Sequence, residues 1–163
     1  MKILVVDDEP SMRQYLEVLL VRSGYEVTTA GGVGQAREAL GSGQVDLVVS
    51  DMRLGKDSGL EVLKHARSRE SPPEVILITA YGTPAAAVEA MRQGAYDYIC
   101  KPFDNEELKL LVQKALEKRN LREENQQLWQ SLSEHSLAWW AGAGPWRASG
   151  RWGGRSPPAD PRC

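Results

Sequence analysis

The chain has 163 residues, of which 42% are hydrophobic and 26% charged, and its formal net charge at pH 7 is −2. This length fits one globular domain of about 100–150 residues plus an appendage. No signal-peptide core, no apolar run of roughly 18 residues and no zinc-ligand spacing around Cys100 and Cys163 is found, so we expect a cytoplasmic protein with no membrane contact and no structural zinc.

Short runs rich in Val and Ile alternate along the chain with amphipathic segments. Continuous hydrophobicity is typical of strands that are buried on both faces of a parallel sheet. The predicted strands are residues 3–6, 26–29, 46–50, 75–79 and 97–100. The predicted helices are residues 11–23, 33–40, 59–68, 84–93 and one that starts near Asn105. Five strands alternating with five helices predict an α/β fold, a (βα)5 doubly wound, five-stranded parallel sheet of the flavodoxin-like type.

Polar side chains stand where four of these strands end. The residues concerned are Asp7 and Asp8 after the first strand, Asp51 after the third, Thr79 at the end of the fourth and Lys101 after the fifth. Each alone has an ordinary explanation as a cap, turn or surface residue, but all four positions lie at successive strand ends. Carboxyl ends of parallel strands meet at one edge of the sheet, so these groups are expected to converge.

Three neighbouring carboxylates repel one another, and a hard divalent cation such as Mg²⁺ relieves that repulsion. Metal, ammonium and hydroxyl groups can each contact one oxygen of a phosphoryl group in transfer. The central carboxylate, that of Asp51, can act as the nucleophile and form an acyl phosphate. The pattern therefore predicts a Mg²⁺-dependent phosphoryl-transfer site.

The segments DDEP, VVSDMRLGKDSG, LITAYGT and AYDYICKPF resemble, in order and spacing, the receiver domains of two-component response regulators. The resemblance covers about residues 1–121 and implies that a partner histidine kinase phosphorylates Asp51. The implied Mg²⁺ ligands are Asp7, Asp8, Asp51 and the backbone carbonyl of Arg53. The implied phosphoryl-binding and switch residues are Thr79, Lys101 and the aromatic Tyr98.

The resemblance also implies a cis peptide bond between Lys101 and Pro102, and a switch on the face formed by the fourth helix, fifth strand and fifth helix, controlling an output such as transcription. One departure stands out. Receivers often carry Pro four residues after the phosphoacceptor, where this chain has Gly55. The departure suggests a looser loop after the third strand, without loss of a chemical group.

The phrases TAYGT, GAYDYICKPF and RNLREENQQL are similar to the nitrogen-regulation subfamily of sigma-54-dependent activators, whose receivers precede an ATPase and a DNA-binding domain. No GxxxxGK[ST] loop or helix-turn-helix pattern follows here. We therefore expect no output domain, no direct DNA binding, and no enzyme activity beyond Mg²⁺-dependent self-phosphorylation and slow self-dephosphorylation.

Two other functions are weighed against a receiver that controls an attached output. A stand-alone receiver that binds a separate target protein is the main alternative. A haloacid-dehalogenase-type phosphatase is less consistent, because Arg53 occupies the place of that family's second Asp and cannot exchange a proton at neutral pH.

Leu121, Asn125, Leu128 and Leu132 follow the 4-3-4 spacing of a coiled-coil seam. A helix that adds to a homodimer and a frayed polar helix both fit this short pattern. We predict a receiver domain at 1–120, a helical linker at 121–135 and a disordered Trp/Gly/Arg/Pro-rich tail at 136–163. The tail fits either a natural basic extension or an out-of-frame translation of a GC-rich gene.

Overall fold

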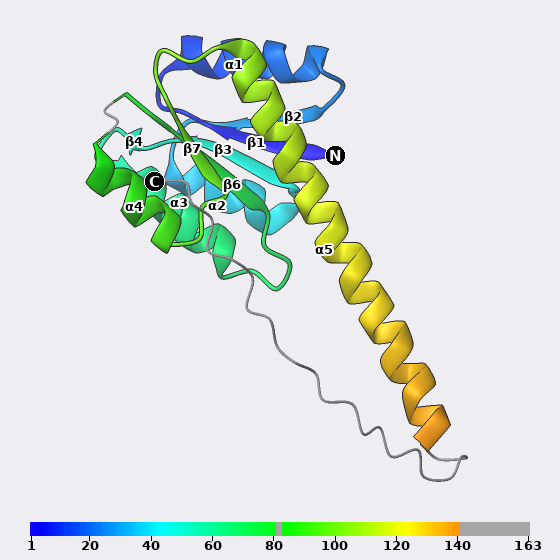
Figure 1. Cartoon of the computed structure of the whole chain (residues 1–163). Coiled ribbons are helices and arrows are strands. Elements are labelled where there is room, and N and C mark those ends of the chain that lie inside the picture. Colours follow the sequence, from blue (N-terminus) through cyan, green and yellow to red (C-terminus); the bar gives the residue numbers. More distant parts are fainter. Residues whose placement is uncertain (81–82, 141–163) are drawn as a thin grey trace. The chain divides into compact units, whose positions relative to one another are not determined.

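The computed structural model describes residues 1–80 and 83–140, and the surroundings of side chains up to residue 134. In chain order its elements are β1 (Lys2–Val6), α1 (Pro10–Arg22), β2 (Glu26–Ala30), α2 (Val33–Ser42), β3 (Leu47–Asp51), β4 (Arg53–Leu54), β5 (Asp57–Ser58), α3 (Gly59–Arg67), β6 (Glu74–Thr79), α4 (Pro84–Arg92), β7 (Asp97–Cys100) and α5 (Asn105–Trp140) (Figure 1). The chain divides into two units, Met1–Asn125 and Gln126–Cys163.

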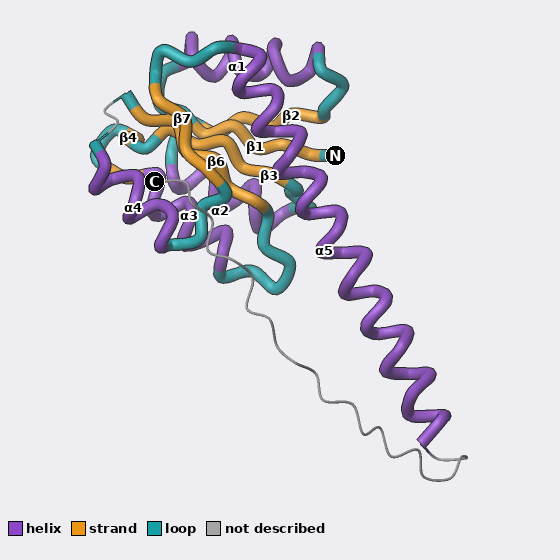
Figure 2. Tube along the Cα trace, viewed as in Figure 1, coloured by secondary structure: helices purple, strands orange, loops and turns teal. Residues whose placement is uncertain are grey.

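Five parallel strands of the first unit form one sheet in the order β2-β1-β3-β6-β7 (Figure 2). Successive side chains of a strand point to opposite faces, so Ile3 and Val5 of β1 lie on one face and Leu4 and Val6 on the other. All four are buried. Both faces are therefore covered, which explains the continuous hydrophobic runs and confirms the predicted (βα)5 fold.

Each face of the sheet has its own apolar core. Helices α1 and α5 cover one face, with Leu16 and Leu108 fully buried against it, and α2, α3 and α4 cover the other with Leu40, Val62 and Ala90 (Figure 1). Burial of one Leu or Val side chain contributes about 1.5–3 kcal/mol. The apolar stripe of each helix thus decides which of its sides meets the sheet.

The predicted strands and helices of the sheet domain are all present, with starts and ends shifted by no more than two residues. The hairpin of β4 and β5, antiparallel with Leu54 opposite Asp57, was not predicted. Each of its strands has only two residues, and so short a segment carries no hydrophobic period.

Helix α5 is 36 residues long and ends at Trp140. The boundaries predicted at residues 120 and 135 therefore both lie inside one helix, and residues 136–140 of the predicted tail are helical. The remainder of that tail, 141–163, lies outside the described residues. Among the helices that are described, none combines the length and the apolar character needed to cross a membrane.

Candidate phosphoacceptor site

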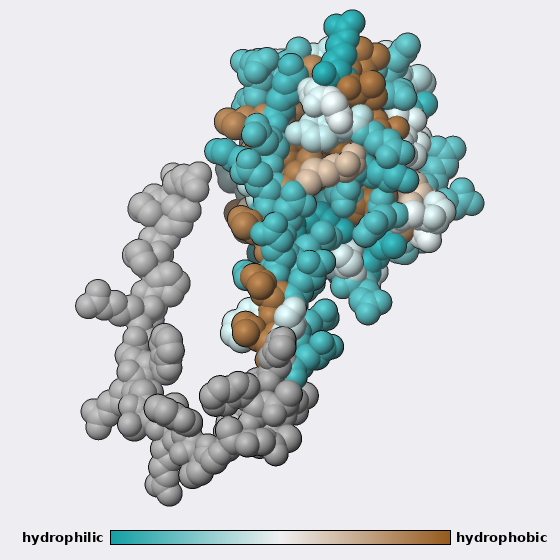
Figure 3. All heavy atoms as spheres, turned by 90° about the vertical axis from the view of Figure 1, so that its right-hand side faces the viewer, coloured by the Kyte–Doolittle hydropathy of each residue, from teal (hydrophilic) through white to brown (hydrophobic). Residues whose placement is uncertain are grey.

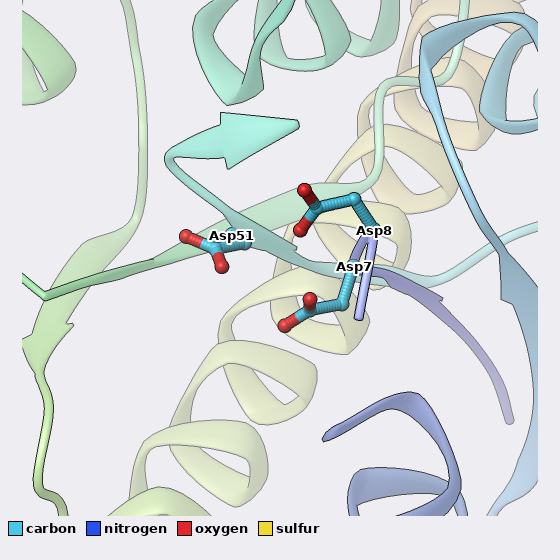
Figure 4. Close-up of side chains that lie close together, drawn as sticks. All are labelled: Asp7, Asp8 and Asp51. Atoms are coloured by element: carbon cyan, nitrogen blue, oxygen red, sulfur yellow. The ribbon is translucent and has the colours of Figure 1, made fainter. Parts of the chain in front are cut away.

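The register of the sheet brings three carboxylates together. Strands β1 and β3 are neighbours, and Val6 stands opposite Ser50. Asp7, which follows β1, and Asp51, the last residue of β3, therefore reach the same edge of the sheet. One carboxylate oxygen from each of Asp7, Asp8 and Asp51 lies within 4.8 Å of the other two. Figure 4 shows the three side chains gathered beyond the ends of β1 and β3. The predicted convergence of these residues is observed.

Asp7 is the most deeply buried carboxylate of the cluster, with only 1% of the residue exposed. The pKa of Asp7 is raised from 3.8 to about 6, and burial is the largest cause. The N–H of Glu9, 2.9 Å from Oδ1, lowers this pKa. The charge of Asp51 raises it, and the charge of Lys101 lowers it. Oδ2 of Asp7 has no hydrogen-bond donor within the described part of the chain. A buried carboxylate oxygen in this state favours a bound cation.

Lys101 supplies part of the missing positive charge. Its Nζ is 3.1 Å from Oδ2 of Asp51 and 4.0 Å from Oδ2 of Asp7. The backbone N–H of Lys101 donates to the carbonyl of Thr79 at 2.8 Å, and the Lys101–Pro102 peptide bond is cis, as the resemblance implies. The ammonium group of Lys101 thus lies beside the Asp51 carboxylate.

A pocket of about 310 Å³ opens beside Asp51. It is lined by Asp8, Asp51, Met52, Arg53, Thr79, Ala80, Thr83 and Ala86. Thr79, at the end of β6, is therefore brought to the site as predicted. Thr83 is the N-cap of α4 and Ala86 lies in its first turn, and the sequence did not predict that either lines the pocket. The pair Thr83–Pro84 marks the start of a helix only four residues after Thr79, and this spacing could have indicated that the start of α4 lies near the site.

The hairpin after β3 contributes backbone groups to the site. The N–H of Arg53 donates to Oδ1 of Asp51 at 3.2 Å, and the N–H of Gly55 donates to Oδ2 of Asp8 at 3.1 Å. In place of the looser loop suggested by Gly55, the chain has a paired turn that adds a hydrogen-bond donor. Strand pairing and the contact with Asp8 are tertiary features that the single residue did not reveal.

Tyr98 is not brought into the acidic pocket. It is half-buried on β7 opposite Leu77 and packs on the core beneath α4. It lines a separate pocket of about 480 Å³ with Asp97, Ile99, Cys100, Pro102, Glu107 and Leu111. The Tyr98 ring therefore contributes to the surface between β7 and α5, and it does not line the pocket beside Asp51.

The donor set fits Mg²⁺. The ion prefers hard oxygen ligands, is held by one or two carboxylates, and keeps several waters. Here three carboxylates meet, one of them buried with an oxygen that accepts no hydrogen bond, and the accompanying ammonium group neutralises only one charge. A softer metal would favour Cys or His ligands, and no Cys or His belongs to this cluster of described residues.

Comparison with known proteins shows which family this chain resembles. Residues 3–113 match the model of the response regulator receiver domain family. The regulatory protein AtoC of Escherichia coli (strain K12) is 40% identical over 132 residues, which are 81% of this chain and 29% of AtoC. The DNA-binding transcriptional regulator NtrC of the same strain is 41% identical over 112 residues, 69% of this chain and 24% of NtrC.

Solved structures show the same fold. A response regulator receiver domain protein from Clostridium thermocellum superposes with a TM-score of 0.69 at 31% identity, covering 74% of this chain and 97% of that protein. NtrX from Brucella abortus in complex with ATP gives 0.73 at 35% identity, covering 78% of this chain and 29% of NtrX. The chain thus spans about a quarter to a third of the longer regulators and matches their receiver portion. The predicted similarity to nitrogen-regulation receivers is confirmed.

Proposed function

This chain belongs to the response regulator receiver family, and from that premise we propose that it accepts a phosphoryl group from a histidine kinase on Asp51, in the cytoplasm and with Mg²⁺. The observation that carries the proposal is the cluster of Asp7, Asp8 and Asp51 at one sheet edge, with Lys101 3.1 Å from the Asp51 carboxylate. The chain itself acts as a signalling domain and catalyses no reaction on other molecules.

In the proposed reaction a carboxylate oxygen of Asp51 attacks the phosphorus, and the bond from phosphorus to the donor's imidazole nitrogen breaks with its electron pair returning to that nitrogen. Asp7, Asp8, Asp51 and the Arg53 carbonyl would hold Mg²⁺, which would supply positive charge to the phosphoryl oxygens. The ammonium group of Lys101, already beside Asp51, exchanges its carboxylate partner for a phosphoryl oxygen in a charge-assisted bond.

We propose that the output follows from Thr79 and Tyr98. The Thr79 hydroxyl binds a phosphoryl oxygen, its movement leaves room beside β6, and the half-buried ring of Tyr98 turns inward. The change alters the face of α4, β7 and α5, and so regulates a transcriptional output. The names of AtoC and NtrC as regulatory proteins support this proposal. Phosphorylation biases two pre-existing states of the face in such a switch.

The nucleophile is tested with acetyl phosphate and Mg²⁺. Asp51→Asn retains the shape of the side chain but removes the anionic oxygen, so mass spectrometry should detect no added phosphate. Asp57→Asn, an exposed acid of the neighbouring hairpin, serves as the matched control and should be labelled like the parent. Equal labelling of Asp51→Asn and the parent would assign the phosphoryl group to another residue.

The metal site is tested by calorimetry. Asp8→Ala removes one hard oxygen ligand from the cluster, and the Mg²⁺ affinity should fall severalfold or more, with phosphorylation falling alongside it. Asp57→Ala removes the same charge from an exposed position and should leave the affinity nearly unchanged. If both variants bound Mg²⁺ as the parent does, Asp8 would not be a ligand.

A further inference from the structure

The backbone amide of Gly55 carries a role that the family resemblance does not supply. Its N–H donates to Oδ2 of Asp8 at 3.1 Å, across 47 residues of sequence. We infer that this N–H positions the Asp8 carboxylate, holding Oδ2 so that Oδ1 is presented to the cation. The inference rests on the proposed Mg²⁺ site and adds a positioning group to it.

The three carboxylates share one arrangement. Each has one oxygen that accepts from a backbone N–H, and the three bonds are Glu9 to Oδ1 of Asp7 at 2.9 Å, Arg53 to Oδ1 of Asp51 at 3.2 Å, and Gly55 to Oδ2 of Asp8. Two of these donors belong to the hairpin that directly follows Asp51. The hairpin therefore orients both Asp51 and Asp8, and the geometry of its turn sets the distance between these two carboxylates.

Asp8 needs such a group more than its neighbours do. Asp7 is 1% exposed and the Asp51 side chain 12%, so packing limits their rotamers, whereas Asp8 is exposed. An exposed carboxylate that is free to rotate loses side-chain entropy when it binds a metal. A hydrogen bond from rigid backbone reduces that loss, as outer-shell partners do at other metal sites.

The conformation at this position explains why Gly is compatible with the bond. Gly55 has φ +65° at the first central position of the turn that joins Leu54 to Asp57. Positive φ there is typical of a type II′ hairpin turn, for which Gly is favoured. The Pro that receivers often carry here has no N–H and fixes φ near about −65°. The departure from the family pattern thus adds a donor that Pro cannot provide.

The hydrogen bond is tested first without metal, by amide exchange measured with NMR. The Gly55 amide should exchange slowly with solvent deuterium in the parent, and at least tenfold faster in Asp8→Ala. The amide of Lys56, the next residue in the turn, is the internal control and should change little. Equal exchange of the Gly55 amide in both proteins would overturn the inference, whatever the outcome for Mg²⁺.

The positioning role is tested by chemical ligation of a chain with D-alanine or D-proline in place of Gly55. Both D-residues favour positive φ, but only D-alanine keeps the N–H. The D-proline protein should bind Mg²⁺ about tenfold more weakly than the D-alanine protein in calorimetry, the lower end of the effect of outer-shell partners. Equal affinities would overturn the positioning role. Failure of the parent itself to bind Mg²⁺ would instead overturn the proposed metal site, with the exchange result unaffected.

Discussion

Asp7 links the protonation of one buried carboxyl group to the stability of the metal-free protein. Its folded-state pKa of about 6 lies above the ordinary 3.8 because burial disfavours the charged form. Between these two pH values the native state binds more protons than the unfolded state, so the free energy of unfolding falls as pH rises. The contribution is present below about pH 4 and is lost above about pH 6.

Asp7→Asn removes that titration and keeps the shape of the side chain. In the absence of Mg²⁺ we expect the variant to gain up to about 2–3 kcal/mol relative to the parent at pH 7, and much less at pH 4. Urea denaturation at both pH values, with Asp57→Asn as the exposed control, measures this difference. A stability difference between variant and parent that is the same at both pH values would contradict the shifted titration.

In the parent, Mg²⁺ should reverse the loss of stability that accompanies rising pH. A bound cation favours the charged form of Asp7, so stabilisation by Mg²⁺, which follows mass action, should grow as pH rises from 5 to 7. In Asp7→Asn the same concentration of Mg²⁺ should add little at any pH. Thermal unfolding with and without MgCl₂ measures both trends, and equal Mg²⁺ stabilisation of parent and variant would exclude Asp7 as a ligand.

At the scale of the element, α5 is joined to the sheet by buried charge at the edge opposite the carboxylate cluster. Arg119 is 4% exposed, and its guanidinium lies 3.1 Å from Asp46 and 3.1 Å from Glu123, while it donates to the carbonyl of Pro72 at 3.1 Å. Glu74, 2% exposed, lies 3.6 Å from Arg122. These contacts connect α5 to the amino ends of β3 and β6.

Arg119→Ala should destabilise the protein by about 3 kcal/mol, because it removes the buried cation that pairs with Asp46 and donates to the Pro72 carbonyl. Lys109→Ala is the matched control: Lys109 lies 3.5 Å from Glu106, an exposed acid of the same helix, so its loss should cost below about 1 kcal/mol. Chemical denaturation compares the two variants. Equal losses of unfolding free energy in the two variants would show that the buried contacts of Arg119 add no more stability than an exposed ion pair.

At the scale of the whole molecule, we propose that phosphorylation promotes a homodimer through the α4, β7 and α5 face. Leu121, Leu128 and Leu132 of α5 are 63%, 59% and 59% exposed, and Figure 3 shows a row of apolar side chains along this helix with polar ones beside it. Their spacing matches a coiled-coil seam. A second copy of the helix would cover them and add avidity to the dimer.

Sedimentation with and without beryllofluoride, a mimic of the phosphoryl group, tests this proposal. The parent should shift toward the dimer, whereas Thr79→Ala should shift less because the hydroxyl that reads the phosphoryl group is missing. Leu128→Lys should weaken the dimer, whereas Val18→Lys should not, because Val18 is an exposed apolar residue of α1 outside the proposed interface. If Thr79→Ala behaved as the parent does, the readout would not pass through Thr79.

The sequence by itself determined the sheet strands, the helices and the residues at the strand ends. Hydrophobic continuity marks a buried strand locally, and Gly, Pro and capping residues mark where helices begin and end. The sequence therefore predicts that one sheet edge carries Asp7, Asp8, Asp51, Thr79 and Lys101. This inference succeeded because parallel strands direct all their carboxyl ends the same way.

Only the tertiary structure decided what surrounds those residues. The order β2-β1-β3-β6-β7 sets Asp7 beside Asp51, and the burial that raises the pKa of Asp7 comes from packing. The bond from Gly55 to Asp8 and the burial of Arg119 against Asp46 join residues far apart in the sequence. Burial and hydrogen-bond geometry depend on how distant segments meet in space, and no local pattern of residues carries that information.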